Sequence, residues 1–275
     1  MTMQAPRETI LSVDHVGMQF GGLVALSDLN FSVGEGEILS LIGPNGAGKT
    51  TAFNLMTGFL TPTKGEVKYR GVVLKGLKSH EIADLGLIRT FQRTSVFPRD
   101  TVFDNVLIGL HRQGKLGLFE ALLGLPRARA SERAQRERAA ELVSWIGLEH
   151  RANDLAGSLS YGEQRLVGVA LALAAQPKML LLDEPVSGMN ASETHTFVQL
   201  IRTIRDRGIT ILLVEHDMPM VMGVSDRIVV LNYGRIIAEG TPDEIRNNPA
   251  VIEAYLGQGA KQVAKPDARK AIPHA

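Results

Sequence analysis

The chain has 275 residues, of which 44% are hydrophobic and 21% are charged, and its formal net charge is +1; this composition is typical of a globular protein with one large α/β domain or two small ones. The near-zero net charge excludes an overall field that would draw the chain onto nucleic acid. The lack of cysteine excludes disulfides, thiolate zinc sites and cysteine nucleophiles, and it suits the cytosol.

We expect neither a transmembrane helix nor a secretory leader. The best candidate span, residues 166–175, has about half of the ~20 residues that a helix needs to cross a bilayer, and Gln176 and Pro177 end it. Residues 1–8 are polar and lack the apolar stretch of a secretory signal. If the protein works at a membrane, other chains supply the membrane part.

The first part of the chain predicts β-strands. Residues 10–20 and 29–33 alternate between apolar and polar side chains, and a Gly-Gly pair ends the first of these stretches. Residues 38–42 form an apolar run of strand length. Residues 66–73 predict a further strand, after a turn that contains threonine, proline and glycine.

A phosphate-binding pattern follows the apolar run 38–42. The pattern G-x-x-x-x-G-K-[ST], with one further threonine beside it, consists of Gly43, Pro44, Asn45, Gly46, Ala47, Gly48, Lys49, Thr50 and Thr51. Because a helix can continue to residue 56, the loop N–H groups would point at one place beside the positive end of the helix dipole. Lys49 could then reach the β- and γ-phosphates of a nucleotide, and the Thr50 hydroxyl could ligate Mg²⁺. The alternative is a glycine-rich turn without a ligand, which the lysine and threonine at this spacing disfavour.

Residues 91–158 have a different hydrophobic pattern, because their apolar residues recur at helical spacing. This pattern predicts a helical insert, and residues 127–138, dense in arginine, alanine and glutamate, predict a long charged helix. Those arginines could form a nucleic-acid patch. Glu132, Glu137 and Glu141 interleave with them, so a solvated helix face is the better interpretation.

Strand patterns return after the insert. Residues 179–182 and 209–214 are apolar runs, and residues 192–207 predict a helix between them. A strand, a helix and a strand joined by short links predict a parallel sheet with right-handed crossovers. Residues 227–239 predict a hairpin around Asn-Tyr-Gly, and Thr-Pro-Asp-Glu at 241–244 predicts a helix start.

Polar residues follow the two apolar runs at the edge where active groups of a parallel sheet gather. Asp183 could hold Mg²⁺, and Glu184 could take a proton from an attacking water. A solvated acidic turn is the alternative, which the phosphate loop makes less convincing. His216 follows the neighbouring run by two residues, so it falls on the same rim and could contact a γ-phosphate; otherwise it is a surface histidine.

A capping pattern stands before the apolar stretch 166–175. Ser160 could cap that helix, with Glu163 completing a capping box, which is a sufficient structural explanation. A serine hydroxyl and free N–H groups at a helix start also make an anion site.

In this order, these motifs resemble the ATP-binding subunits of ABC transporters, over roughly residues 9–257. The matching segments are the phosphate loop at 43–50, the Q-loop at Gln92, the signature at 159–164, the Walker B strand at 179–184, the D-loop at 187–190 and the switch histidine at His216. The resemblance implies an α/β fold: a P-loop NTPase (RecA-like) core with an antiparallel β edge and an inserted helical subdomain. The core would comprise residues 9–91 and 164–257, the helical signature subdomain residues 92–163, and a disordered tail residues 258–275.

The chain is more specifically similar to the first of the two ATPases of bacterial branched-chain amino-acid importers. The stretches that carry this similarity are Phe20–Leu23, Gly86–Gln92, Glu215–Met218 and residues 246–257. The resemblance implies ATP and Mg²⁺ as cofactors, a second ABC ATPase subunit that can be identical or not, two membrane permease subunits, and a periplasmic binding protein that delivers the substrate. It implies a peripheral place on the cytoplasmic face of the inner membrane, and no nucleic-acid partner.

The same resemblance assigns further site residues. Phe20 would stack on adenine, although the sequence alone allows a core phenylalanine equally well. Gln92 would sense the metal and the attacking water. Ser160 and Gly162, with Glu163 beside them, would meet the nucleotide held by the other ATPase subunit.

Two departures from the family pattern stand out. The common signature is LSGGQ; here Tyr161 replaces the first glycine and Glu163 replaces the glutamine, although tyrosine at this place is usual in the branched-chain group. The D-loop ends in Asn190 where many relatives have aspartate.

Two other functions would use the same motifs. One is an ABC ATPase for another substrate, such as urea, short amides or an exported lipid. The other is a soluble ABC ATPase that acts on DNA, ribosomes or an assembly scaffold; the sequence lacks the long heptad repeats, zinc cysteines or second ATPase copy typical of the first two, which leaves the scaffold-assembly ATPase.

Because the chain lacks a membrane span and the resemblance implies membrane partners, we expect a docking surface for them in the stretch just after Gln92. Apolar residues Val96, Phe97, Val102 and Phe103 are spaced through residues 94–104. They could instead belong to the core of the insert.

Overall fold

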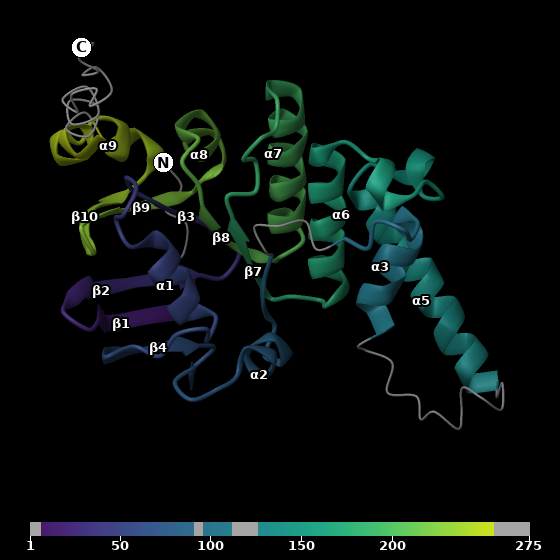
Figure 1. The fold of residues 1–275 in the computed structure, drawn as a ribbon, viewed down its shortest axis with the longest axis horizontal. Helices are drawn as coiled ribbons and strands as arrows, with labels where there is room; N and C mark the ends of the chain where they lie inside the picture. Colours follow the sequence, from purple (N-terminus) through teal and green to yellow (C-terminus); the bar gives the residue numbers. More distant parts are fainter. Residues whose placement is uncertain (1–6, 91–95, 112–125, 256–275) are drawn as a thin grey trace, which may run out of the picture.

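Two β-sheets share one core, and the helices lie around and beyond the second sheet (Figure 1). The structure is a computed structural model that describes residues 7–90, 96–111 and 126–255. The first sheet is antiparallel and has the order β2-β1-β4-β5. Its strands are β1 (Thr9–Phe20), β2 (Leu23–Gly34), β4 (Lys64–Tyr69) and β5 (Val72–Val73).

The second sheet has the order β10-β9-β3-β8-β7-β6, and it carries the sequence motifs at its edge. Its strands from β9 to β6 run parallel, and β10 pairs antiparallel at one side. The strands are β3 (Ile38–Ile42), β6 (Leu87–Arg89), β7 (Met179–Asp183), β8 (Thr210–Val214), β9 (Arg227–Asn232) and β10 (Arg235–Gly240). The parallel sheet and the hairpin predicted from the sequence are confirmed.

Helices α6 and α7 lie between the second sheet and the far end of the molecule, where α3 and α5 lie, away from the antiparallel sheet (Figure 1). The helices are α1 (Lys49–Met56), α2 (Ser79–Asp84), α3 (Val102–His111), α5 (Pro126–Trp145), α6 (Tyr161–Ala174), α7 (Ala191–Asp206), α8 (Met218–Val224) and α9 (Pro242–Arg246), with single 3₁₀ turns at Glu149–Arg151 and Ala156–Ser158. In the described ranges, no helix combines the length and the apolar character needed to span a bilayer.

The central strands β3, β7 and β8 are buried along their whole length, as expected for a parallel sheet covered on both faces. Strand alternation sends Leu180 and Leu182 into the core with α3, α5, α6 and α7. It sends Met179 and Leu181 into the core with α1 and the antiparallel sheet. The two faces are therefore sealed, and the carboxyl ends of the strands are left to form the site.

The charged helix and the helix starts agree with the sequence patterns. In α5, Arg133 pairs with Glu137 at 2.9 Å and Arg136 with Glu132 at 3.1 Å, and all four side chains are exposed. This confirms a solvated helix face. The capping box predicted at the start of α9, with Thr241 as the N-cap, is also present.

Two strand predictions were inaccurate. Residues 66–73 do not form one strand: Arg70 and Gly71 have φ of 49° and 78°, so the chain turns between β4 and β5, as positive φ at both central residues of a tight hairpin requires. Strand β2 begins at Leu23 rather than at residue 29, because it pairs with β1 from there on. The predicted tail, residues 258–275, lies outside the described residues.

The expected docking stretch divides into core and surface. Val102 is fully buried in the core of α3, α5 and α6, so of the two alternatives it belongs to the core of the insert and not to a docking surface. Val96 and Phe103 are partly buried against the same core. Phe97 is 49% exposed, so it can still form part of a docking surface.

Candidate functional site

The site lies at the carboxyl edge of the second sheet. Gly43 follows β3, Glu184 follows β7, and His216 lies two residues after β8. These three strands are neighbours, and Asp183 at the end of β7 pairs with the last residue of β8. The rim predicted from the sequence therefore exists, although the phosphate loop, the carboxylates and the histidine are far apart in the sequence.

The phosphate loop is closed by its own lysine. Lys49 Nζ donates hydrogen bonds to the backbone oxygens of Gly43 at 2.6 Å and Pro44 at 3.2 Å. Burial lowers the pKa of the Lys49 ammonium, while the nearby carboxylates of Glu184 and Asp183 act in the opposite direction. The lysine is thus held over the loop, within the field of both acidic residues.

The backbone of the loop depends on glycine at two places. Gly43 has φ of +154°, and a Cβ there would lie 2.2 Å from the backbone oxygen of Leu231. Gly48, the N-cap of α1, has φ of +106°, and a Cβ would lie 2.7 Å from a methyl carbon of Leu26. Because the loop lies this close to its neighbours, only glycine fits.

Gly43→Ala is expected to destabilise the fold more than Gly46→Ala. Gly46 also has a positive φ of +81°, but a Cβ there would meet nothing within 4 Å, so it serves as the control for backbone strain alone. The excess loss in unfolding free energy should be about 1–3 kcal/mol, typical of overpacking. Chemical denaturation of both variants measures it, and equal losses would mean that contact with Leu231 is not limiting.

A cavity of about 460 Å³ lies beside the loop and has the size of a small-molecule site. Its walls combine the loop with Glu184 and with exposed apolar side chains, among them Phe20, Leu23, Val24 and Tyr233. Phe20 is 44% exposed, so it is not a core phenylalanine. A cavity lined by the backbone of the phosphate loop and by the rings of Phe20 and Tyr233 suits a nucleotide, with phosphates and a base.

Tyr233 is a cavity residue that sequence reasoning missed. It lies in the turn between β9 and β10, has φ of +46° and is 70% exposed. The turn is joined to the loop because Gly234 N donates to Ala47 O at 2.9 Å, and to β2 because Ser27 N donates to Gly234 O at 2.9 Å. The Asn-Tyr-Gly turn gave a signal for a hairpin, but none for its position beside the loop.

The two acidic residues after β7 differ in environment. Asp183 has a side chain only 4% exposed, and its Oδ2 accepts a hydrogen bond from Arg89 at 2.7 Å. The Glu184 side chain is 31% exposed and lies on the cavity. Glu184 has φ of +46°, an uncommon conformation for a residue with a side chain, and its N–H donates to Val214 O at 2.8 Å. Strained backbone of this kind gathers at functional sites.

His216 faces the same acidic residue. Its Nδ1 lies 3.9 Å from Oε1 of Glu184 and 3.7 Å from Oε2 of Glu215, and its side chain is 60% exposed. This spacing is longer than a direct hydrogen bond between the histidine and Glu184. The two side chains therefore lie near each other on the rim without a direct hydrogen bond.

Glu215 hydrogen-bonds to the backbone of the two turns at the rim, and the sequence analysis gave it no role. It is fully buried, and its carboxylate accepts backbone N–H bonds from Val186 at 3.0 Å, His216 at 2.8 Å and Asp217 at 3.2 Å. It joins the turn after β7 to the turn after β8. The sequence signal for Glu215 was an acidic residue directly after a buried, mostly apolar strand.

The signature segment lies apart from this cavity. Ser160 caps α6, and with Glu163 it forms the predicted capping box. The Glu163 carboxylate also pairs with Arg151 at 3.1 Å. Ser160 Oγ donates to Glu193 Oε1 at 3.3 Å, and Glu193 also crowds Gly162. Among the described residues that line the phosphate-loop cavity, none belongs to the signature.

Two remaining residues complete the set. Asn190, the departure in the D-loop, caps α7, since its Oδ1 accepts from Ser192 N at 2.9 Å and Glu193 N at 3.0 Å. Asparagine and aspartate are both strong N-caps, so the change keeps this structural role. Gln92, predicted as a catalytic and metal-sensing residue, lies outside the described residues.

The residues present fit a magnesium nucleotide. Glycines keep the loop open to close approach, Lys49 supplies positive charge, Thr50 on the cavity supplies a hydroxyl oxygen, and Asp183, close enough to act on Lys49, supplies a carboxylate. Mg²⁺ is commonly bound by one or two carboxylates together with substrate phosphates. This donor set is therefore sufficient for such a metal.

Comparisons with known proteins agree with this geometry. A family model described as ABC transporter matches residues 26–187, and one described as branched-chain amino acid ATP-binding cassette transporter matches residues 235–261. The chain is 48% identical over 252 residues to the high-affinity branched-chain amino acid transport ATP-binding protein LivG of Escherichia coli, covering 91% of this chain and 99% of LivG.

Solved structures give the same result for the fold. A crystal structure of the ADP conformation of an ATP-binding cassette of an ABC transporter aligns with a TM-score of 0.79 and 31% sequence identity, over 91% of this chain and 99% of the other. A dimeric post-hydrolysis cassette bound to ADP and Pi aligns with a TM-score of 0.69 and 26% identity, over 84% and 98% of the two chains.

Proposed function

The chain belongs to the ABC transporter family of ATP-binding proteins, and we propose that it is the ATP-hydrolysing subunit of an importer for branched-chain or related amino acids. Lys49 and Glu184 line one cavity, the Asp183 carboxylate acts electrostatically on Lys49, and His216 lies 3.9 Å from Glu184. This clustering supports the ATPase activity. The substrate class is supported by the likeness to LivG and by the second family match near the C-terminus.

In the proposed mechanism, the protein contributes mainly positioning and charge, as phosphoryl transfer generally requires. Lys49 exchanges its two loop carbonyls for phosphate oxygens. Thr50 and Asp183 would hold Mg²⁺, which would supply positive charge to neutralise the phosphates. Glu184 accepts a proton from the attacking water, and His216 holds the γ-phosphate.

The catalytic site is proposed to be complete only in a dimer of ATPase subunits. The signature residues Ser160 and Gly162 lie apart from the cavity of their own chain, so they would serve the nucleotide bound by the other subunit. A solved relative is dimeric with ADP and Pi bound, which supports this arrangement. A single subunit should therefore be a poor ATPase.

We further propose that the protein works peripherally at the cytoplasmic face of the inner membrane, on two permease subunits fed by a periplasmic binding protein. The described part of the predicted docking stretch supports this with an exposed ring. Phe97 is held on a fixed loop, because buried Asn105 accepts from Phe97 N at 2.7 Å and donates to Phe97 O at 3.0 Å. Arg99, beside it, is exposed.

Arg99→Glu is expected to abolish membrane recruitment or transport while ATP affinity and melting temperature stay normal. A reversed charge beside Phe97 should oppose docking without changing the core. Lys75→Glu, an exposed charge reversal between β5 and α2, is the matched control. Undiminished transport by the Arg99 variant in the full complex would exclude this stretch as the docking surface. A fall in melting temperature above about 5 °C would be a stability effect of at least roughly 1 kcal/mol and would contradict the expectation.

The substrate is tested on the complex rather than on this subunit, which the substrate never touches. We expect the cognate periplasmic protein to bind leucine, isoleucine or valine, and proteoliposomes of the whole complex to accumulate them only with ATP. Binding of urea or a short amide instead would replace the substrate class. Co-purification with a cytosolic scaffold, and not with membranes, would contradict the transport function.

A further inference from the structure

One arginine joins the two elements that carry the proposed magnesium ligands. Arg89 ends β6, and its side chain is only 13% exposed. Its Nη2 donates to Asp183 Oδ2 at 2.7 Å, at the end of β7, and its Nη1 donates to Asn54 Oδ1 at 2.7 Å, in α1. The guanidinium therefore bridges the strand that carries Asp183 and the helix that carries Thr50.

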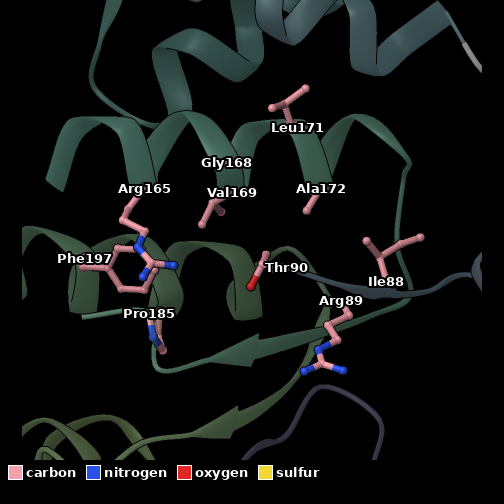
Figure 2. Close-up of a pocket in the computed structure, with 10 residues that line it drawn as sticks. All are labelled: Ile88, Arg89, Thr90, Arg165, Gly168, Val169, Leu171, Ala172, Pro185 and Phe197. Carbon is pink, nitrogen blue, oxygen red and sulfur yellow. The ribbon is translucent and has the colours of Figure 1, made fainter. Parts of the chain in front are cut away.

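Strand alternation explains why Arg89 reaches this side of the sheet. Strands β6 and β7 run parallel with Arg89 opposite Leu181, and Asp183 lies two residues further along, on the same face. Figure 2 shows the Arg89 side chain pointing away from the α6 residues with which Ile88, Arg89 and Thr90 line a cavity of about 240 Å³.

The arginine is itself fixed in place. Its guanidinium carbon lies 5.1 Å from the centre of the Phe53 ring and 5.7 Å from that of Phe59. A planar guanidinium held by rings and by bonds from two of its nitrogens is well ordered, which lysine could not reproduce. With Asp183 Oδ2 engaged, a metal ion or its bound water would use the other carboxylate oxygen.

We propose that Arg89 is a positioning residue for the magnesium site, because it orients the Asp183 carboxylate and fixes the spacing between β7 and α1. This inference rests on the proposed function, since it requires a magnesium nucleotide at the phosphate loop. Partners that hydrogen-bond to metal ligands typically contribute 10–100-fold in metal affinity. A merely structural arginine would change stability and leave metal affinity unaltered.

The test measures metal binding without catalysis. Mn²⁺ is titrated into the full chain saturated with ADP, and free Mn²⁺ is followed by electron paramagnetic resonance, with ADP alone as the baseline. Arg89→Met keeps the length of the side chain and removes its donors, so we expect about 10–100-fold weaker Mn²⁺ binding. Affinity for metal-free ADP, measured in EDTA, should stay near the wild-type value. Arg138→Met is the matched control, because Arg138 also pairs with a carboxylate, Glu141, and stacks on a ring, Trp145.

The outcomes distinguish a failure of this inference from a failure of the proposed function. A folded Arg89→Met variant with wild-type Mn²⁺ affinity overturns the inference and leaves the proposed function intact. A wild-type chain that binds no ADP overturns the proposed function itself. If the methionine variant fails to fold, Arg89→Lys decides: its single point charge cannot bridge Asp183 and Asn54 together, so Mn²⁺ affinity should fall several-fold, and an unchanged affinity contradicts the proposal.

Discussion

Glu184→Gln is expected to bind ATP normally and to lose turnover by about 10²–10⁴-fold, the usual contribution of a general base. The amide keeps the shape of the side chain but cannot accept the proton of the attacking water. The residue lies on the nucleotide cavity and 3.9 Å from His216. Turnover is measured on the assembled transporter, and ATP affinity on the isolated chain with a fluorescent analogue.

The control for this variant is Glu253→Gln, an exposed carboxylate that does not line the nucleotide cavity, which should turn over like the wild type. Turnover by Glu184→Gln within a factor of about three of wild type would remove Glu184 from the role of base. Loss of ATP binding in the same variant would instead point to a role in holding the nucleotide.

Lys49→Ala is expected to weaken ATP binding by about 10–100-fold, since hydrogen bonds to charged groups are worth about 1.5–3 kcal/mol, and to abolish hydrolysis. The lysine bonds to the backbone of its own loop at Gly43 and Pro44. Equilibrium binding of a fluorescent ATP analogue measures the first effect, and phosphate release by the assembled complex measures the second.

Lys178→Ala is the matched control, because Lys178 is exposed and directly precedes β7, at the opposite edge of the sheet. It should bind ATP like the wild type. Unchanged affinity and turnover in Lys49→Ala would mean that the loop has only a structural role.

Features encoded by local pattern were predictable from the sequence. The buried runs of β3, β7 and β8 had the length and composition of parallel strands, and the capping boxes at Ser160 and Thr241 lie within four consecutive residues. The phosphate loop is also recognisable from a short local pattern. The positions of Asp183 and His216 near it were predictable from the rule that active groups gather at one edge of a parallel sheet. Their chemical roles stay predictions.

Features that depend on distant partners were not predictable. Arg89 is 94 positions from Asp183, and Glu215 is 29 positions from Val186; no local pattern marks either pair. Short elements also escaped, because the three residues of β6 are too few to display a period. The turn between β4 and β5 was missed because positive φ at Arg70 is set by the pairing of the two strands around it.

The hydrogen bonds of Lys49 to Gly43 and Pro44 have a consequence for the affinity of the loop for phosphate. An ammonium has three donors, and two of them have partners within the loop itself. If Lys49 binds phosphate as proposed, an arriving phosphate would replace existing acceptors, and the gain in binding free energy would be the difference between charged and neutral partners. After product release, the same two carbonyls would again be available as acceptors for the lysine. These internal hydrogen bonds would therefore moderate nucleotide affinity.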